Sequence, residues 1–378
     1  MSCQNLPERK DKALHHIAII FGTRPEAIKL ASVARAIEKD PNIKTTLINT
    51  GQHDTLMPTI MRQFGVTIDQ NLHVLEPGQP LGVLGGKLLT VLTKTLEDLK
   101  PDLVVVQGDT LSAQMGAMAA FYLGIPIGHV EAGLRTYNTL SPFPEESSRR
   151  VISLMATLHF AATSGAEANL KHERVSGLIE VTGNPVVDAL TRILNQITVS
   201  PKGNKDFRIV ATIHRRENHP YLDKIFGALA DLADDQETEV LISVHANPVI
   251  RASANRVLAS SHVNTIEPLD YIEWLSLMQT ADLLISDSGG IQEEAPVLGI
   301  PLLIARDMTE RPEVVDSGHA YLVGHDRAKI TSMARAAKAG TLPFSAAGSP
   351  FGEGDAGERI AHAISRYLSN AVAMEVIS

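Results

Sequence analysis

Short apolar runs rich in β-branched residues alternate with longer helical patterns along almost the whole chain. The first run is residues 17–21, and Pro25 then begins a helical pattern that is expected to cover residues 26–38. Strands that are separated by helices pair in parallel, because a parallel connection needs a long crossover. The chain is therefore predicted to be an α/β protein with parallel sheets rather than a set of hairpins.

The strand candidates fall into two consecutive series. The first consists of residues 17–21, 45–49, 103–107, 127–130 and 158–161, and the second of residues 208–213, 239–244, 263–266, 283–286, 301–305 and 320–323. The 378 residues also exceed the length at which one hydrophobic core stops growing. Two doubly wound, Rossmann-like domains facing a cleft are the simplest architecture, with ligands expected at the carboxyl ends of the strands.

This pattern divides the chain into four parts. A polar leader is expected at residues 1–15, a first domain at 16–183, a second domain at 184–355 and a terminal helical segment at 356–378. The polar stretch 200–206 is either a linker or a surface loop. The helical periodicity of the last segment does not by itself indicate which domain it packs against.

Charge and cysteine content disfavour several classes of protein. The 34 basic and 43 acidic residues give a formal charge of −9, which argues against a broad surface for nucleic acid or anionic lipid. The single cysteine, Cys3, excludes a disulfide within the chain and fits a reducing compartment. The leader lacks the apolar core of a secretory signal, and no apolar run is long enough to span a bilayer. We therefore expect a cytoplasmic protein without a membrane segment.

Basic residues lie where the first strand passes into its helix. Arg24 and Lys29 flank a helix N-terminus, where free N–H groups favour an anion, although an ordinary turn with exposed basic side chains would have the same sequence. The segment has neither the P-loop pattern nor the glycine pattern of dinucleotide-binding proteins. ATP and NAD are therefore not indicated.

Carboxylates follow the later strands of the first series. Asp109 comes two residues after the run 103–107 and is either an acid or base or the cap of the next helix. Glu131 follows the next strand, and Glu145 begins a helix whose dipole it could simply complement. Carboxylates that meet at one sheet edge raise each other's proton affinity, so their convergence favours acid–base chemistry.

The second series carries basic and glycine-rich strand ends. His214 and Arg215 follow its first strand and suit phosphate contact or proton transfer, and His245 follows the next strand. A charged surface cluster is the alternative for these residues. No His/Cys cluster and no HExxH motif is present, so a metal site is not expected.

The stretch 286–296 is the most informative part of this half. Ser288, Gly289 and Gly290 form a turn at a helix start where a diphosphate would fit, and Glu294 lies at a suitable distance to bind a ribose diol. Arg311 follows the next strand and adds a fixed positive charge. Together these residues predict a nucleotide-diphosphate site.

The chain resembles the non-hydrolysing UDP-N-acetylglucosamine 2-epimerases. The matching segments are GTRPEAIK (22–29), GQH (51–53), GDT (108–110), GHVEAGLRT (128–136), PFPEE (142–146), HRREN (214–218), SDSGGIQEEAP (286–296) and TERPE (309–313). The resemblance implies a fold like that of the two-domain GT-B glycosyltransferases, with the terminal helix returning to the first domain. It also implies a UDP-sugar substrate, no cofactor and a homodimer.

The resemblance further implies a mechanism. The C2 proton of UDP-GlcNAc is removed, UDP is expelled to leave 2-acetamidoglucal, and UDP returns with protonation of the opposite face to give UDP-ManNAc. The implied catalytic residues are Asp109, Glu131, Glu145 and His214. The implied substrate-binding residues are Arg24, Lys29, Arg149, Trp274, Ser288, Gly289, Gly290, Glu294 and Arg311.

Some positions depart from the family pattern. Many bacterial members have an arginine after the QH pair and a later HLNP, and bind a second UDP-GlcNAc as an activator, whereas this chain has Asp54 and Ala246. The candidate residues for such an allosteric site are Gln52, His53, Arg215 and His245. Four alternatives stay open: a 2-epimerase for a related UDP-sugar such as a 2,3-diacetamido uronate, a hydrolysing enzyme, a retaining GT-B glycosyltransferase and a non-catalytic sensor.

Overall fold

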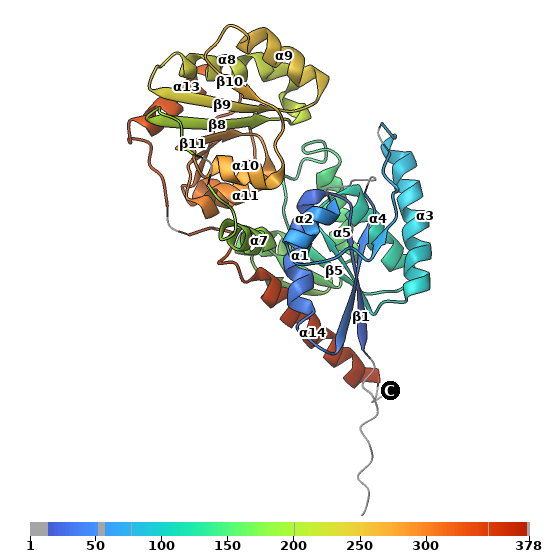
Figure 1. The fold of residues 1–378 in the computed structure, drawn as a ribbon. Coiled ribbons are helices and arrows are strands. Elements are labelled where there is room, and N and C mark those ends of the chain that lie inside the picture. The colour runs from blue at the N-terminus through green and yellow to red at the C-terminus, as the bar shows by residue number, and fades with distance from the viewer. Residues whose placement is uncertain (1–13, 52–56, 77, 200, 347, 376–378) are drawn as a thin grey trace, which may run out of the picture. The chain divides into compact units, whose positions relative to one another are not determined.

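The computed structural model describes residues 14–51, 57–76, 78–199, 201–346 and 348–375, which form two compact units (Figure 1). Of the described residues, the first unit contains those up to Gly133, then Asn138–Pro185 and those from Asp355 onward. The second contains Leu134–Tyr137 and Val186–Gly354. No helix in the described part of the chain is long and apolar enough to cross a membrane.

The first unit is built on a seven-stranded parallel sheet with the strand order β3-β2-β1-β4-β5-β6-β7. Its elements are β1 (His15–Phe21), α1 (Arg24–Ile37), β2 (Ile43–Asn49), α2 (Met57–Gln63), β3 (Gln70–Asn71), α3 (Leu81–Leu99), β4 (Leu103–Gln107), α4 (Leu111–Tyr122), β5 (Ile127–Ala132), α5 (Glu145–Met155), β6 (Leu158–Ala161), α6 (Ser164–His172), β7 (Leu178–Val181) and α14 (Ala356–Glu375). The strand order reverses direction between β1 and β4. Such a reversal is where doubly wound sheets bind their ligands.

The second unit has a six-stranded parallel sheet with the order β10-β9-β8-β11-β12-β13. Its elements are α7 (Pro185–Leu194), β8 (Phe207–Ile213), the 3-10 helix η1 (Arg216–Tyr221), α8 (Leu222–Ala233), β9 (Thr238–Val244), α9 (Pro248–Leu258), β10 (Asn264–Ile266), α10 (Tyr271–Met278), β11 (Leu283–Ser286), α11 (Gly289–Leu298), β12 (Leu302–Ile304), α12 (Pro312–Asp316), β13 (Ala320–Leu322) and α13 (Arg327–Lys338). The reversal here lies between β8 and β11.

The two sheets confirm the predicted α/β class with doubly wound, parallel strands. Each predicted strand is present, with ends that differ by at most two residues. The strands β3 and β7 were not predicted, because they form the sheet edges and lack a buried apolar run. The segment 201–206 lies inside the second unit as a loop before β8.

The terminal helix α14 belongs to the first unit and covers Ala356–Glu375, within the helical segment predicted at residues 356–378. It packs against α1. The Ser365 hydroxyl donates to Oδ2 of Asp40 at 3.0 Å, and Lys39 forms an ion pair with Glu358. These contacts fix the end of the chain next to the helix that follows β1.

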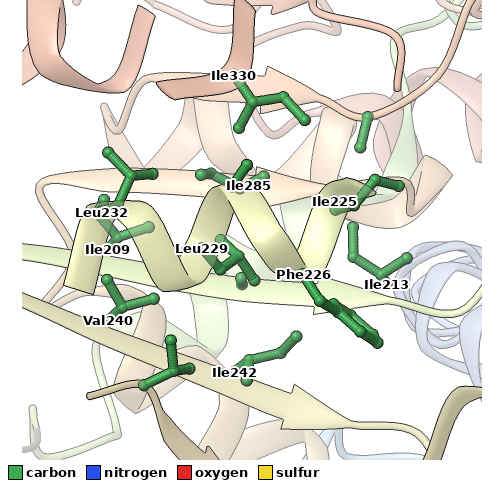
Figure 2. Packing of buried hydrophobic residues seen from close by; sticks show 14 of the residues in the cluster. Ile209, Ile213, Ile225, Phe226, Leu229, Leu232, Val240, Ile242, Ile285 and Ile330 are labelled. Atoms are coloured by element: carbon green, nitrogen blue, oxygen red, sulfur yellow. The ribbon is translucent and has the colours of Figure 1, made fainter. Parts of the chain in front are cut away.

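Helices on both faces bury the strands of each sheet. In the second unit α8, α9 and α13 lie on one face and α10 and α11 on the other (Figure 1). Figure 2 shows Phe226 and Leu229 of α8 packed over the sheet residues Ile209 and Ile242. All five residues of β4 in the first unit are also buried. Strands that are buried on both faces leave only the residues beyond their carboxyl ends to meet a ligand.

Candidate functional site

Gly22 and Glu26 join the two loops at the strand reversal of the first unit. A Cβ atom on Gly22 would lie 2.2 Å from Oγ of Ser112, so only glycine permits this approach of α4 to the end of β1. The buried Glu26 carboxylate accepts hydrogen bonds from the Gly22 and Thr23 amides at 3.1 and 2.8 Å, and from the Thr110 hydroxyl at 2.6 Å. Burial raises the pKa of Glu26, and these hydrogen bonds act in the opposite direction. The loops after β1 and β4 are therefore held together.

Asp109 follows β4 and pairs with a buried arginine. Nη2 of Arg149, on α5, lies 2.5 Å from Oδ2 of Asp109, and its Nη1 lies 3.4 Å from Oε2 of Glu146. The side chain of Asp109 is 23% exposed, whereas those of Arg149 and Glu146 are 4% and 0% exposed. Asp109 is thus the member of this group that a ligand can reach, and Arg149 fixes its position.

Glu131 lies in a local irregularity of β5. Its backbone has φ +63°, in the left-handed region, and the pairing of β5 with β6 shifts register between Val130 and Ala132. The buried Glu131 carboxylate accepts a hydrogen bond from Nζ of Lys29 at 2.6 Å and another from the side-chain amide of Gln107. Backbone strain of this kind is concentrated at functional sites. Lys29, predicted to bind substrate, thus neutralises a predicted catalytic carboxylate.

Two other predicted residues begin helices of the first unit. Arg24 is the first residue of α1 and is partly buried. Glu145 is the first residue of α5 and is half-buried, and no described residue forms a hydrogen bond or ion pair with it. The neighbouring Glu146, rather than Glu145, is the carboxylate that faces Arg149.

The N-terminus of α11 combines free amides with two guanidinium groups. The Ser288 hydroxyl precedes the helix without capping it. A Cβ atom on Gly289 would lie 2.9 Å from Nη1 of Arg311 and 3.2 Å from Nη2 of Arg215. Glycine at this position therefore lets both arginines approach the first turn of the helix. Helix amides and paired arginines are the groups that bind diphosphates in proteins.

Buried carboxylates hold the arginines of this unit in place. Arg311 donates to Oε1 of Glu293 at 2.6 Å and to Oε1 of Glu310 at 2.5 Å. Arg306 donates to Oε2 of Glu310 at 2.9 Å and to Oε1 of Glu217 at 2.6 Å. Because Glu310 joins both arginines, the guanidinium of Arg311 is fixed before a ligand arrives. Such pairing also offsets the cost of burying the charges.

His214 follows β8 beside a fully buried carboxylate. Its Nδ1 lies 3.5 Å from Oδ1 of Asp287, and its ring centroid lies 5.9 Å from that of His245. Burial lowers the pKa of His214, the Asp287 charge opposes this, and Arg215, His245 and Arg306 lower it further. The imidazole is therefore mainly neutral near pH 7 and able to take up a proton when an anion binds.

Glu294, the predicted ribose-binding residue, lies on α11 next to an aromatic side chain of α10. The Tyr271 hydroxyl donates to Oε1 of Glu294 at 3.2 Å, and burial followed by the Glu294 charge raises the pKa of Tyr271. Trp274, predicted to lie near a base, is one turn further along the same helix and partly exposed. The structure thus brings Tyr271 to the predicted ribose contact.

The structure describes two of the four residues that were predicted for an allosteric site. Gln52 and His53 lie outside the described residues. The guanidinium of Arg215 lies next to Gly289 at the N-terminus of α11, and the ring of His245 lies beside that of His214. Both residues are therefore close to the predicted diphosphate site. Within the described ranges no group of three or more His, Cys, Asp or Glu side chains could hold a metal ion.

Sequence reasoning did not single out several residues of these clusters. All three of the following are buried and contact a predicted residue: Gln107 contacts Glu131, Glu146 contacts Arg149, and Asp287 lies beside His214. A polar residue within or beside an apolar strand was the available signal, because a buried polar group needs a partner. Tyr271 could have been found by asking which aromatic residues share a helix with Trp274.

The family model described as UDP-N-acetylglucosamine 2-epimerase matches residues 35–365. The UDP-N-acetylglucosamine 2-epimerase of Escherichia coli K12 is 39% identical over 367 residues, which are 92% of this chain and 98% of the relative. The structure of UDP-GlcNAc 2-epimerase from Neisseria meningitidis bound to UDP-GlcNAc superimposes with a TM-score of 0.87 at 36% identity, covering 93% of this chain and 100% of that one. For the Methanocaldococcus jannaschii enzyme in complex with UDP-GlcNAc and UDP the TM-score is 0.80 at 32% identity, with 93% and 99% covered. These matches confirm the predicted family: the chain belongs to the UDP-N-acetylglucosamine 2-epimerases.

Proposed function

We propose that this protein interconverts UDP-GlcNAc and UDP-ManNAc by eliminating UDP and adding it back. The observation that carries the proposal is the pair of carboxylates, Asp109 and Glu131, each held by a fixed cation at the carboxyl end of neighbouring strands. Inversion at C2 needs one group that removes a proton from one face of the sugar and another that returns a proton to the other face. Two positioned carboxylates meet that requirement.

In the proposed reaction the C2–H bond gives its proton to one carboxylate while the C1–O bond breaks. The electron pair of the C–H bond forms the C1–C2 double bond of 2-acetamidoglucal, and the pair of the C–O bond leaves with UDP. UDP then adds back to C1 as the other carboxylate protonates C2. The amides of Gly289 and Gly290, with Arg311, are proposed to bind the diphosphate, and His214 to supply a proton to it.

Other predictions rest on the family alone. Roles for Arg24 and Glu145 in substrate contact and proton transfer stay predictions, as do the uracil contact of Trp274, a homodimer and a cytoplasmic location. The proposed reaction is redox-neutral and uses UDP itself as the leaving group, so it requires no nicotinamide.

Incubation with UDP-GlcNAc in deuterated water tests the proposed function. We expect UDP-ManNAc that carries deuterium at C2, and deuterium in the recovered UDP-GlcNAc, as observed by NMR. Product without deuterium at C2 would contradict elimination. Free ManNAc with UDP would indicate a hydrolysing enzyme, and turnover only of a 2,3-diacetamido uronate analogue would indicate a related epimerase.

Replacement of Gly289 by alanine is expected to weaken UDP binding about 10- to 100-fold, equivalent to about 1.4–2.8 kcal/mol. The new methyl group would lie 2.9 Å from Nη1 of Arg311 and so displace the guanidinium. Gly290→Ala is the matched comparison, because a Cβ atom there has its nearest neighbour, Oγ of Ser288, at 3.8 Å. Calorimetric titration with UDP should show a loss for Gly289→Ala at least several times that for Gly290→Ala. Equal losses would refute the assigned role of Arg311.

A further inference from the structure

Asp287 joins the two loops at the strand reversal of the second unit. It follows β11, is fully buried, and accepts hydrogen bonds from the backbone amides of His214 at 3.0 Å and Arg215 at 2.8 Å. Both amides belong to the loop after β8, the neighbour of β11 in the sheet. The carboxylate thus fixes the backbone of the residue that is proposed to face the diphosphate.

Asn218 holds this carboxylate from the other side. Its fully buried side-chain amide donates to Oδ2 of Asp287 at 2.8 Å and to the Ala305 carbonyl at 2.9 Å. These bonds use both N–H groups, so Oδ1 of Asn218 must accept. Nε2 of His325 lies 2.7 Å from that oxygen and is therefore the donor, which fixes the proton of His325 on Nε2.

His325 is itself held by ring stacking. Its ring lies 4.1 Å from that of Tyr221, centroid to centroid, with an interplanar angle of 15°. A continuous series of contacts therefore runs from Tyr221 through His325 and Asn218 to Asp287. Each member has a fixed hydrogen-bonding or stacking direction, so the Asp287 carboxylate cannot rotate without breaking several contacts.

The two oxygens of Asp287 are used unequally. Oδ2 accepts from His214 N, Arg215 N and Asn218 Nδ2, whereas the hydrogen bond that reaches Oδ1 within the described residues comes from His214 N. Oδ1 is also the oxygen that lies 3.5 Å from Nδ1 of His214. It retains capacity to accept the Nδ1 proton. A proton on Nδ1 that is directed to this oxygen leaves Nε2, the other ring nitrogen, for a ligand.

We propose that Asp287 is a positioning residue for His214 that holds the imidazole with its proton on Nδ1, and that Asn218 and His325 fix Asp287 for this purpose. Nε2 is then the atom that exchanges a proton with the diphosphate of the UDP-sugar. The inference rests on the proposed function for this last step only. The hydrogen-bonded arrangement itself is independent of the reaction.

The charge of Asp287 also affects the protonation of His214. The groups that act on the imidazole are Asp287 after β11, Arg215 in the same loop, His245 after β9 and Arg306 after β12. Burial and the three basic groups lower the pKa of His214, and Asp287 raises it. Removal of the carboxylate charge therefore lowers this pKa further. If the imidazolium form of His214 assists the departure of UDP, a variant without the Asp287 charge should lose activity on the alkaline side at a lower pH than the unaltered protein does.

The main test is Asp287→Asn, which preserves the shape of the side chain and removes its charge. We expect kcat to fall about 10- to 100-fold, UDP affinity to stay within about threefold, and the alkaline limb of the pH–rate profile to move to lower pH. Asp223→Asn replaces an exposed carboxylate of the same unit that is paired with Arg256, and should leave kcat and the profile unchanged. An unchanged kcat and pH profile in Asp287→Asn would overturn the proposal.

Two further measurements keep the proposal testable if Asp287→Asn does not fold. Nitrogen-15 NMR of the imidazoles in the unaltered protein, with the His214 signals assigned by their loss in His214→Asn, should show the Nδ1–H form above the pKa of this residue. An Nε2–H form would overturn the proposal.

His325→Phe keeps a ring against Tyr221 but removes the donor to Asn218, and should lower kcat while UDP still binds. If the unaltered protein does not epimerise UDP-GlcNAc, the proposed function fails while the NMR result still decides the positioning of His214.

Discussion

Glu131→Gln is expected to reduce kcat about 10³-fold or more while UDP binding is retained, because glutamine keeps the shape of the side chain but cannot take up or release a proton. The carboxylate lies 2.6 Å from Nζ of Lys29 and is 3% exposed. Its partner cation favours the ionised form, which is the form that a base requires. Steady-state kinetics in both directions and calorimetric titration with UDP measure the two quantities.

The folding of this variant needs a separate control, because glutamine leaves the buried Lys29 without its counter-charge. Glu131→Asp keeps the charge and moves it by about one methylene group, so it should fold and retain a small fraction of the activity. Glu180→Gln changes an exposed glutamate of β7 that is paired with Arg366, and should leave kcat unaltered. If folded Glu131→Gln has more than about a tenth of the original kcat, its proposed part in proton transfer is wrong.

Asp109→Asn is expected to lower kcat about 10²- to 10⁴-fold. Asp109 is the most exposed member of the group that includes Arg149 and Glu146. Arg149 keeps an ionic partner in Glu146 after the substitution, so this variant should fold more readily than Glu131→Gln. The loss should therefore appear in kcat and not in the thermal unfolding temperature.

Deuterium exchange shows whether Asp109 and Glu131 serve different faces of the sugar. If they do, each single variant keeps the carboxylate on one face of the sugar. It should still exchange the C2 proton of the epimer whose proton lies on that face with deuterated water, and should not exchange the C2 proton of the other epimer. The two variants should have opposite preferences. If one variant exchanged neither epimer and the other variant exchanged both, the assignment of one carboxylate to each face would be wrong.

The strand pattern and the motifs of the sequence were enough to predict the fold class and the family. Buried parallel strands such as residues 103–107 are recognisable because helices cover both faces and the first four residues are all apolar. The edge strand β7 was not found, because its exposed face removes that signal. Motifs at strand ends also predicted that Asp109, His214 and Ser288 lie just beyond the strands of their sheets, as they do. Glu131 was expected after its strand, but it lies within β5, which extends to Ala132.

The sequence does not indicate which polar residues form hydrogen bonds or ion pairs with one another. Lys29 lies on α1, and nothing in its spacing indicates that it pairs with Glu131, which lies 102 residues further along the chain. In the same way, helix position alone cannot decide between Glu145 and Glu146, although Glu145 is half-buried and Glu146 is fully buried in contact with Arg149. A difference of one position rotates a side chain by about 100° around the helix, and only packing shows which direction faces the sheet.

The sequence by itself determined the parallel α/β architecture, the family and the strand ends that carry polar groups, because these depend on local periodicity and on short contiguous motifs. The tertiary structure decided which charges neutralise one another, how Gly289 admits two arginines, and how Asp287 joins the loop of His214 to the end of β11. Those features depend on hydrogen bonds and ion pairs between residues up to about a hundred positions apart. Such contacts are fixed only when the sheet order brings distant strand ends to one place.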